Sequence, residues 1–481
     1  MESNQRAQWS NNLVFILAAI GSAIGMGNLW GFPYKMGANG GLPFLIIYLA
    51  MVILCGVIVM SVEMVIGRST GKSPILAMTK VAKKWKFVGV FGVLCSFLIM
   101  GFYSVLIGYA LRYFVGFLVQ IFGASGFGGA ATGADFFVSF TQNVPMVVLF
   151  TVLTFVLCGI IVAGGVKGGL EKFNKVGIPG LFVILILIII YNFVALGNTE
   201  YGKASEGLKF MFTTWGLEVT DSKFDFFSAL RTAGGQMLFS LSLGMGCMIT
   251  YGSYLGKKEN IIKNAWIIPA FDTLAAIMAG MAIFPAVFAT GNKVNAGPGL
   301  LYMTMHDVFS SMGYVGNFVG MLFYLLVIFA GVSSAISLME VAAASIIDDV
   351  ESKGKKANRT RITVIVTAIM FVLSILVGLD QLGIPGDQGF FWPLYSFLGS
   401  GSQDLLDVFD LLAEGLLMPL GSILMCVVVG WIKGHDWMKK EVTCEGNKFH
   451  GEGFFKACVR YVTPVLMVFV LISLFLSYFG V

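Results

Sequence analysis

Charged side chains are scarce in this sequence. Of its 481 residues, 12% are charged and 57% are hydrophobic, whereas a soluble domain carries about a quarter charged residues. This balance excludes an ordinary soluble protein. The net charge of +5 follows from basic residues in short loops, as shown below, and gives no indication of a nucleic-acid partner.

Cysteine and histidine are also rare. The seven cysteines are scattered without a CxxC pair, and His306, His435 and His450 all fall in expected loops. These positions exclude a disulfide framework and a histidine-based metal site within the membrane. No cluster pairs a nucleophile with a base, so we do not expect an enzyme.

Apolar segments near the ~20 residues that cross a bilayer recur along the whole chain. They predict an all-α polytopic membrane protein, a single transmembrane domain over residues 1–481 with eleven transmembrane helices. The expected spans are 12–37, 41–67, 88–122, 145–163, 176–196, 228–255, 264–290, 316–347, 361–379, 405–432 and 457–479.

Basic residues are divided unevenly among the loops between these spans. If the N-terminus is inside, the inner loops and the N-terminal segment hold 23 of the 31 lysines and arginines. The positive-inside rule therefore predicts a cytoplasmic N-terminus, and eleven crossings place Val481 outside. The expected location is the cell (plasma or inner) membrane.

Two spans are interrupted by glycine and polar residues at their centres. The first span contains GSAIGMGN at residues 21–28, and the sixth contains FSLSLGMG at residues 239–246. Because they are five spans apart, they run in opposite directions. This arrangement predicts inverted repeats over about 10–196 and 228–432, with an extra helix at about 457–479, and a binding site at the middle of the membrane.

An unwound turn in a membrane protein exposes backbone carbonyl groups that are costly to leave unsatisfied. Sodium is a hard cation and suits such oxygen ligands, while the N-termini of half-helices favour an anionic group. One break can therefore hold a cation and a carboxylate together. Gly21 and Gly25 alone would indicate close helix packing, but Asn28 and the matching break favour ion binding.

The same residues resemble the first-helix signature of the neurotransmitter:sodium symporter family, in its bacterial amino-acid carrier type. The resemblance covers most of the chain and is carried by Trp9, residues 21–34, Asn39-Gly40-Gly41, Glu63, Gly67-Arg68 and residues 330–334. It implies two inverted five-helix repeats with unwound helices one and six. It also implies sodium-coupled symport by alternating access. A channel would instead show a repeated pore loop or a charged ring, and neither is found.

The resemblance implies two sodium sites. The first would use Ala23, Asn28, Ser240 and Asp272, and the second would use Gly21, Ile24, Ala330, Ser333 and Ser334. An intramembrane carboxylate such as Asp272 is costly and marks function. Many relatives have asparagine there and bind chloride through a serine four residues later, where this chain has Ala276. We therefore expect that chloride is not required.

The implied substrate is a neutral amino acid with a large hydrophobic or aromatic side chain. Gly25 stands where monoamine carriers have an amine-binding aspartate, so the amine would meet backbone carbonyl groups. The expected pocket residues are Ala23, Gly25, Gly27, Ile99, Tyr103, Phe239, Ser240, Ser242, Met245, Ser334 and Leu338. Helix packing is the alternative for Ile99, Met245 and Leu338. For the whole protein, the alternatives are a non-transporting amino-acid sensor and a carrier of another small zwitterion.

Two gates also follow from the resemblance. Outside, Tyr103 and Phe239 would cover the substrate, and Asp410 would supply the acid of an ion pair. Gly31 stands where relatives have the basic partner of this acid. Lys35 is therefore a candidate for that partner. The inner gate would consist of Arg6 paired with Asp348, near Trp9 and Tyr254. The expected partners are the lipid bilayer, sodium and the amino acid. The protein itself is expected to be a monomer or a weak dimer.

Overall fold

The computed structural model describes residues 8–195, 203–213, 224–291, 299–380, 389–395 and 404–478. Within these ranges the chain is helical and contains no strand. Nine helical stretches are long and apolar enough to cross a membrane, and a tenth is a pair of helices, Asn12–Ala23 and Gly27–Ala38, bent by 53°. The predicted all-α polytopic fold is confirmed.

The helices follow the predicted spans closely, with one exception. The fifth stretch begins at Val166 rather than at residue 176. The sixth span is broken where the sequence predicted, into α11 (Phe226–Ser240) and α12 (Cys247–Gly252). Each of these is too short to be recognised as a span by itself, so the total of eleven stays a prediction.

The membrane helices, in chain order, are built as follows. They are α1 (Asn12–Ala23) with η1 (Gly27–Gly31) and α2 (Phe32–Ala38); α3 (Leu42–Met51) with η2 (Val52–Gly56) and α4 (Val57–Thr70); α6 (Lys86–Ile121); α8 (Val144–Ala163); η4 (Val166–Leu170) with α9 (Glu171–Ala195); α11 and α12; α13 (Ile261–Ala289); α15 (Gly313–Ser352); α16 (Arg359–Leu379); α18 (Leu405–Asp410) with η7 (Leu411–Leu417), α19 (Met418–Val427) and η8 (Val428–Ile432); and α21 (Glu452–Ala457) with η10 (Cys458–Val462) and α22 (Thr463–Tyr478).

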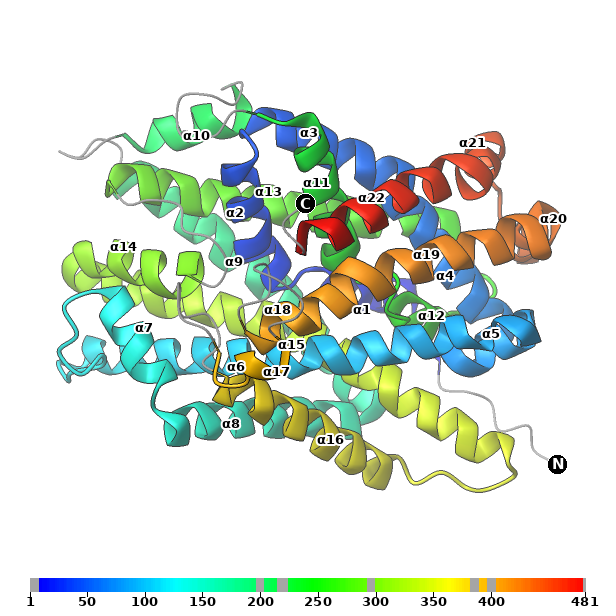
Figure 1. Ribbon diagram of the computed structural model, residues 1–481, viewed down its shortest axis with the longest axis horizontal. Coiled ribbons are helices and arrows are strands. Elements are labelled where there is room, and N and C mark those ends of the chain that lie inside the picture. The colour runs from blue at the N-terminus through cyan, green and yellow to red at the C-terminus, as the bar shows by residue number, and fades with distance from the viewer. Residues whose placement is uncertain are drawn as a thin grey trace.

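Short helices that the sequence did not predict lie at the two ends of this bundle. At one end are α5 (Pro74–Val81) and α20 (His435–Val442), near the described N-terminal residues. At the opposite end are α7 (Gly133–Thr141), α10 (Ala204–Phe212) and α14 (Met305–Ser311) (Figure 1). The long helices α6 and α15 pack against each other between these ends.

The first helix breaks because the backbone turns at Ile24 and the next N–H leaves the helical hydrogen-bond pattern. Ile24 is extended, with φ −70° and ψ 107°. The backbone N–H of Gly25 then donates to Asn28 Oδ1 at 2.9 Å instead of to the carbonyl of Gly21. Consequently the Gly21 carbonyl lies at the end of α1 without its usual helical donor.

The sixth helix breaks over residues 241–246, where the backbone turns left-handed. Ser242 has φ 53°, and Gly244 and Gly246 both have φ 78°, which only glycine adopts without strain. Gly244 also lies so close to α19 that a Cβ would be 2.4 Å from the Met418 carbonyl oxygen. The Gly244 N–H donates to Glu63 Oε1 at 2.7 Å, so the Glu63 carboxylate holds this turn.

Candidate functional site

The two breaks face each other across a small cavity. Ser242 Oγ, in the second break, donates to the carbonyl of Ser22 in the first at 2.7 Å. The cavity is lined by the eleven predicted pocket residues and by Ser22: Ser22, Ala23, Gly25, Gly27, Ile99, Tyr103, Phe239, Ser240, Ser242, Met245, Ser334 and Leu338. Ser22 was missed, although it belongs to the predicted break.

The cavity is tightly closed around Gly25. Its volume is about 20 Å³, room for roughly one water molecule. A Cβ on Gly25 would lie 2.5 Å from Tyr103 Oη and 2.7 Å from Ser334 Oγ. Tyr103 is held in place because its hydroxyl accepts the N–H of Met26 at 3.0 Å. No side chain larger than glycine fits at position 25 without displacing these groups.

A buried carboxylate joins the two breaks on one side of the cavity. Asp272, on α13, is fully buried. Its Oδ1 accepts Asn28 Nδ2 at 2.8 Å, and its Oδ2 accepts Ser240 Oγ at 2.9 Å. The structure therefore brings together three of the four residues predicted for the first sodium site, while Ala23 lines the adjoining cavity. Tyr48 Oη, 3.4 Å from Asp272 Oδ2, was not predicted.

Oxygen atoms of the second predicted sodium site meet between α1 and α15. Ser334 Oγ lies within 3.5 Å of the carbonyl oxygens of Gly21, Ser22, Ile24 and Ala330, any one of which can accept its single hydroxyl hydrogen. Ser333 Oγ donates to the Ala330 carbonyl at 2.9 Å. All five predicted residues therefore lie in one cluster of carbonyl and hydroxyl oxygens, the ligand types that suit a hard monovalent cation.

A cleft of about 330 Å³, on the side predicted to be outside, lies on the other side of Phe239 from this cavity. We call it the outer cleft. Phe239 and Gly27 line both spaces. The rings of Tyr103 and Phe239 are 6.5 Å apart, so the predicted aromatic cover stands between cleft and cavity. Asp410 lines the cleft, but the ion pair of Lys35 is with Glu414, one helical turn further on, at 3.0 Å. The charge of Asp410 also acts on Lys35, so the candidate pairing of Lys35 with Asp410 stays a prediction, and Glu414 is a partner that the sequence did not suggest.

Replacing Lys35 with methionine is expected to destabilise the protein by about 1–3 kcal/mol, because Glu414, whose side chain is 10% exposed, is left without its partner. A second change, Glu414→Gln, should restore most of the loss, since the uncompensated charge is then gone. Thermal unfolding of both single variants and the double variant measures the coupling. Strictly additive losses would contradict this pairing.

The predicted inner-gate residues Trp9 and Tyr254 lie beside the start of α1 and the end of α12. Trp9 Nε1 donates to the Tyr251 carbonyl at 3.1 Å, and the rings of Trp9 and Tyr254 are 6.1 Å apart. Asp348 accepts Lys72 Nζ at 3.0 Å and the Ser73 N–H at 2.7 Å. Arg6, its predicted partner, lies outside the described residues.

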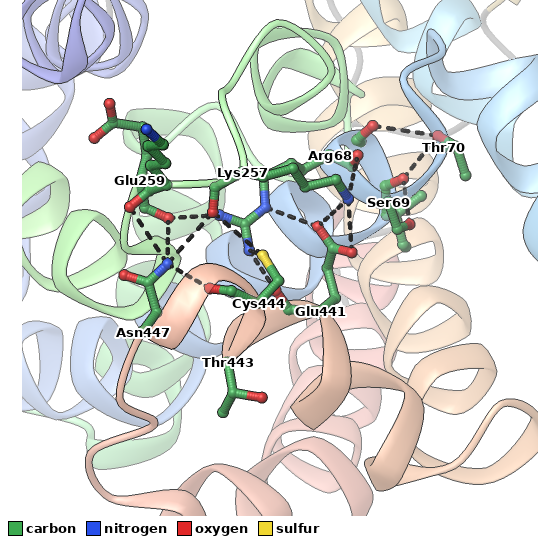
Figure 2. Close-up of polar contacts among 12 residues, drawn as sticks. Arg68, Ser69, Thr70, Lys257, Glu259, Glu441, Thr443, Cys444 and Asn447 are labelled. Atoms are coloured by element: carbon green, nitrogen blue, oxygen red, sulfur yellow. Dashed lines mark hydrogen bonds and ion pairs between the residues drawn. The ribbon is translucent and has the colours of Figure 1, made fainter.

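Two further ionic contacts on this side were not predicted as pairs. Glu340 is fully buried, accepts the Tyr254 hydroxyl at 2.7 Å and forms an ion pair with Arg359. Figure 2 shows the second, in which the guanidinium of Arg68 at the end of α4 reaches Glu441 on α20.

Arg68 joins three segments that are far apart in the sequence. Its Nε donates to Glu441 Oε1 at 2.8 Å, one Nη donates to the Glu259 carbonyl and the other to the Glu441 carbonyl (Figure 2). Glu441 also accepts Lys257 Nζ at 2.8 Å. The loop that follows α12 is thus tied to α4 and α20, on the side that carries the predicted inner gate.

The chain is similar in sequence to known transporters over nearly its whole length. The chain is 31% identical to the sodium-dependent transporter YhdH of Bacillus subtilis, over 98% of this chain and 99% of that protein. It is 30% identical to a sodium-dependent transporter of Methanocaldococcus jannaschii, over 92% of this chain and 85% of the relative.

A solved structure gives the same result for the fold. The crystal structure of MhsT in complex with L-phenylalanine superposes with a TM-score of 0.83 at 33% identity, covering 98% of this chain and 100% of MhsT. The sequence pattern of one family matches residues 6–122 and 138–480. The chain therefore belongs to the sodium:neurotransmitter symporter family.

Proposed function

We propose that this protein is a sodium-coupled symporter that imports a neutral α-amino acid with a large hydrophobic or aromatic side chain. The observation that carries the proposal is the pair of facing breaks. They gather two sets of oxygen atoms, one with a buried carboxylate, around one cavity. The proposed location is the cell membrane, with the N-terminus inside and the C-terminus outside.

The cavity offers complementary groups to both ends of a zwitterion. The space around position 25 admits only glycine, so the first break offers no acidic side chain to the amine. The amine would therefore bind backbone carbonyl groups exposed by the breaks. The substrate carboxylate would bind the first sodium ion, the Gly27 N–H and the Tyr103 hydroxyl. Asp272 is already engaged with Asn28 and Ser240, which favours an ion-binding role over amine recognition.

The remaining lining is apolar, which supports an uncharged substrate side chain. Ile99, Phe239, Met245 and Leu338 surround the cavity. Because its volume is about 20 Å³, an aromatic side chain requires some of these residues to move, and methionine adapts readily. The related MhsT structure holds L-phenylalanine, which supports the aromatic assignment.

Alternating access would close the outer side and then open the inner side. In this conformation a cleft reaches Phe239 from outside, while contacts of Trp9, Arg68 and Glu340 close the inside. Import then requires that the outer cleft closes, with Phe239 over the substrate, before the inner contacts separate. This order of steps couples the movement of sodium to that of the amino acid, because the breaks bind both ligands.

Thermal unfolding of the purified protein tests the proposal. Each standard amino acid is added in sodium chloride or in potassium chloride, and the melting temperature is recorded. We expect phenylalanine, tyrosine, tryptophan or leucine to raise the melting temperature in sodium only, since a ligand stabilises the state that binds it. If no amino acid stabilises the protein in a sodium-dependent way, the proposed function is wrong.

A further inference from the structure

One buried amide on α9 has no partner for its oxygen. The side chain of Asn174 is 1% exposed, and its Nδ2 donates to the Leu170 carbonyl at 2.9 Å. Its Oδ1 has no hydrogen-bond partner among the described residues. Buried polar atoms are almost always paired, so an unpaired one needs an explanation.

This oxygen lies directly against the break in the first helix. A Cβ built on Gly21 would lie 2.2 Å from Asn174 Oδ1 and 3.0 Å from Ile178, one turn later on α9. Gly21 belongs to the oxygen cluster of the second proposed sodium site, through its contact with Ser334. Asn174 Oδ1 therefore faces Gly21, one residue of that cluster, from the side of α9.

The part of α9 that carries Asn174 is weakly held as a helix. It follows the π-helix η4, which contains Gly168 and Gly169, and it precedes Pro179. Proline has no N–H, so the carbonyl four residues earlier, at Lys175, loses its helical donor.

Glu171, at the start of α9, accepts both the N–H and the hydroxyl of Ser10 at the inner end of α1. Asn174 thus lies between this inner contact and the oxygen cluster.

We propose that Asn174 Oδ1 is an additional sodium ligand of the second site, contributed from α9 on the inner side. The inference rests on the proposed function. An amide oxygen is a hard ligand of the type that oxygen-coordinated cations accept, and sodium would satisfy an atom that is otherwise unpaired. Movement of the inner end of α9 would withdraw this ligand and favour release of the ion to the cytoplasm.

A purely structural role for Asn174 makes a different prediction, and the chain provides a matched control. Asn192 lies on the same helix and is fully buried, its Nδ2 donates to the Ala282 carbonyl at 2.6 Å, and its Oδ1 is also unpartnered among the described residues. No residue of the proposed sodium sites is among its contacts. Both Asn174→Ala and Asn174→Asp remove the bond to Leu170, whereas only the aspartate retains a ligand oxygen.

Equilibrium binding of radioactive sodium decides between a ligand role and a purely structural role of Asn174. It is measured on the purified full-length protein, without amino acid and at constant ionic strength with potassium. We expect Asn174→Ala to raise the half-saturating sodium concentration about tenfold, Asn174→Asp to lower it, and Asn192→Ala to leave it within about twofold. If both Asn174 variants weaken binding alike, or if Asn174→Ala binds as the wild type does, the inference is wrong. If the alanine variant does not fold, an aspartate variant with unchanged or weaker affinity overturns it.

The wild-type protein separates this inference from the proposed function. If the wild type binds no sodium, sodium coupling itself is wrong. If the wild type binds sodium and stabilises with an amino acid while Asn174→Ala binds sodium equally well, only the role of Asn174 is wrong.

Discussion

Replacing Asp272 with asparagine is expected to weaken sodium binding at the first site at least about a hundredfold, because the ion loses the buried charge that compensates its own. Asp272 is fully buried and is oriented by Asn28 and Ser240. Asparagine keeps the size of the side chain but not its charge. The substrate carboxylate then remains as the one negative group proposed to face this ion.

The measurement is sodium-dependent uptake of L-phenylalanine into proteoliposomes, with gluconate in place of chloride. The wild type should transport at an unchanged rate without chloride, since the fixed carboxylate of Asp272 supplies the negative charge that a bound anion would otherwise provide. The variant should need far more sodium for half-maximal uptake. A large loss of wild-type rate in gluconate, or a normal sodium dependence of Asp272→Asn, would show that this carboxylate does not compensate the ion.

Asp380→Asn provides a control for burial of a carboxylate. Asp380 is also fully buried, but it accepts the N–H groups of Phe391 and Leu405 and the hydroxyl of Tyr395, away from both sodium clusters. Its loss should lower the melting temperature without changing the sodium concentration that gives half-maximal uptake. A shift in both variants would indicate a general effect of lost stability.

The breaks could be predicted from sequence because glycine and polar residues are conspicuous in apolar spans. The pocket residues followed from the resemblance, and the structure gathers them around one cavity. The start of the fifth span was missed because Lys167, Gly168 and Gly169 read as a loop, whereas the structure forms a π-helix there. Hydropathy does not register a helix stabilised mainly by packing on its neighbours.

Contacts between distant segments were the part that the sequence did not reveal. Tyr48 sits in an apolar stretch and Asn174 lies between Lys172 and Lys175, so neither carries a local signal. Their positions beside Asp272 and Gly21 depend on how the helices pack. The ion pair of Lys35 with Glu414 depends on how η7 packs against α2. Register of this kind is fixed by side-chain packing, which one sequence alone does not specify.

Replacing Arg68 with alanine should lower the free energy of unfolding by about 3–5 kcal/mol, because it breaks a buried ion pair and leaves several acceptors unsatisfied. The Arg68 side chain is fully buried, and it donates to the Glu441 carboxylate and to the carbonyls of Glu259 and Glu441. Lysine should not restore the loss, since a point charge with three donors does not match the planar fork of arginine. Thermal unfolding of Arg68→Ala and Arg68→Lys gives both values.

A thiol probe can report the same change locally. Cys444 is partly exposed beside Arg68, at 3.3 Å from an Nη atom, whereas the other six cysteines are buried. Loss of Arg68 should therefore speed maleimide labelling of Cys444, because the loop after α12 separates from α20. Lys257→Ala is the matched control: Lys257 shares Glu441 but is 49% exposed, and such pairs contribute about 0–1 kcal/mol. If the two alanine variants melt and label alike, Arg68 does not hold the inner side closed, and the restraint must lie with Trp9 or with the ion pair of Glu340 and Arg359.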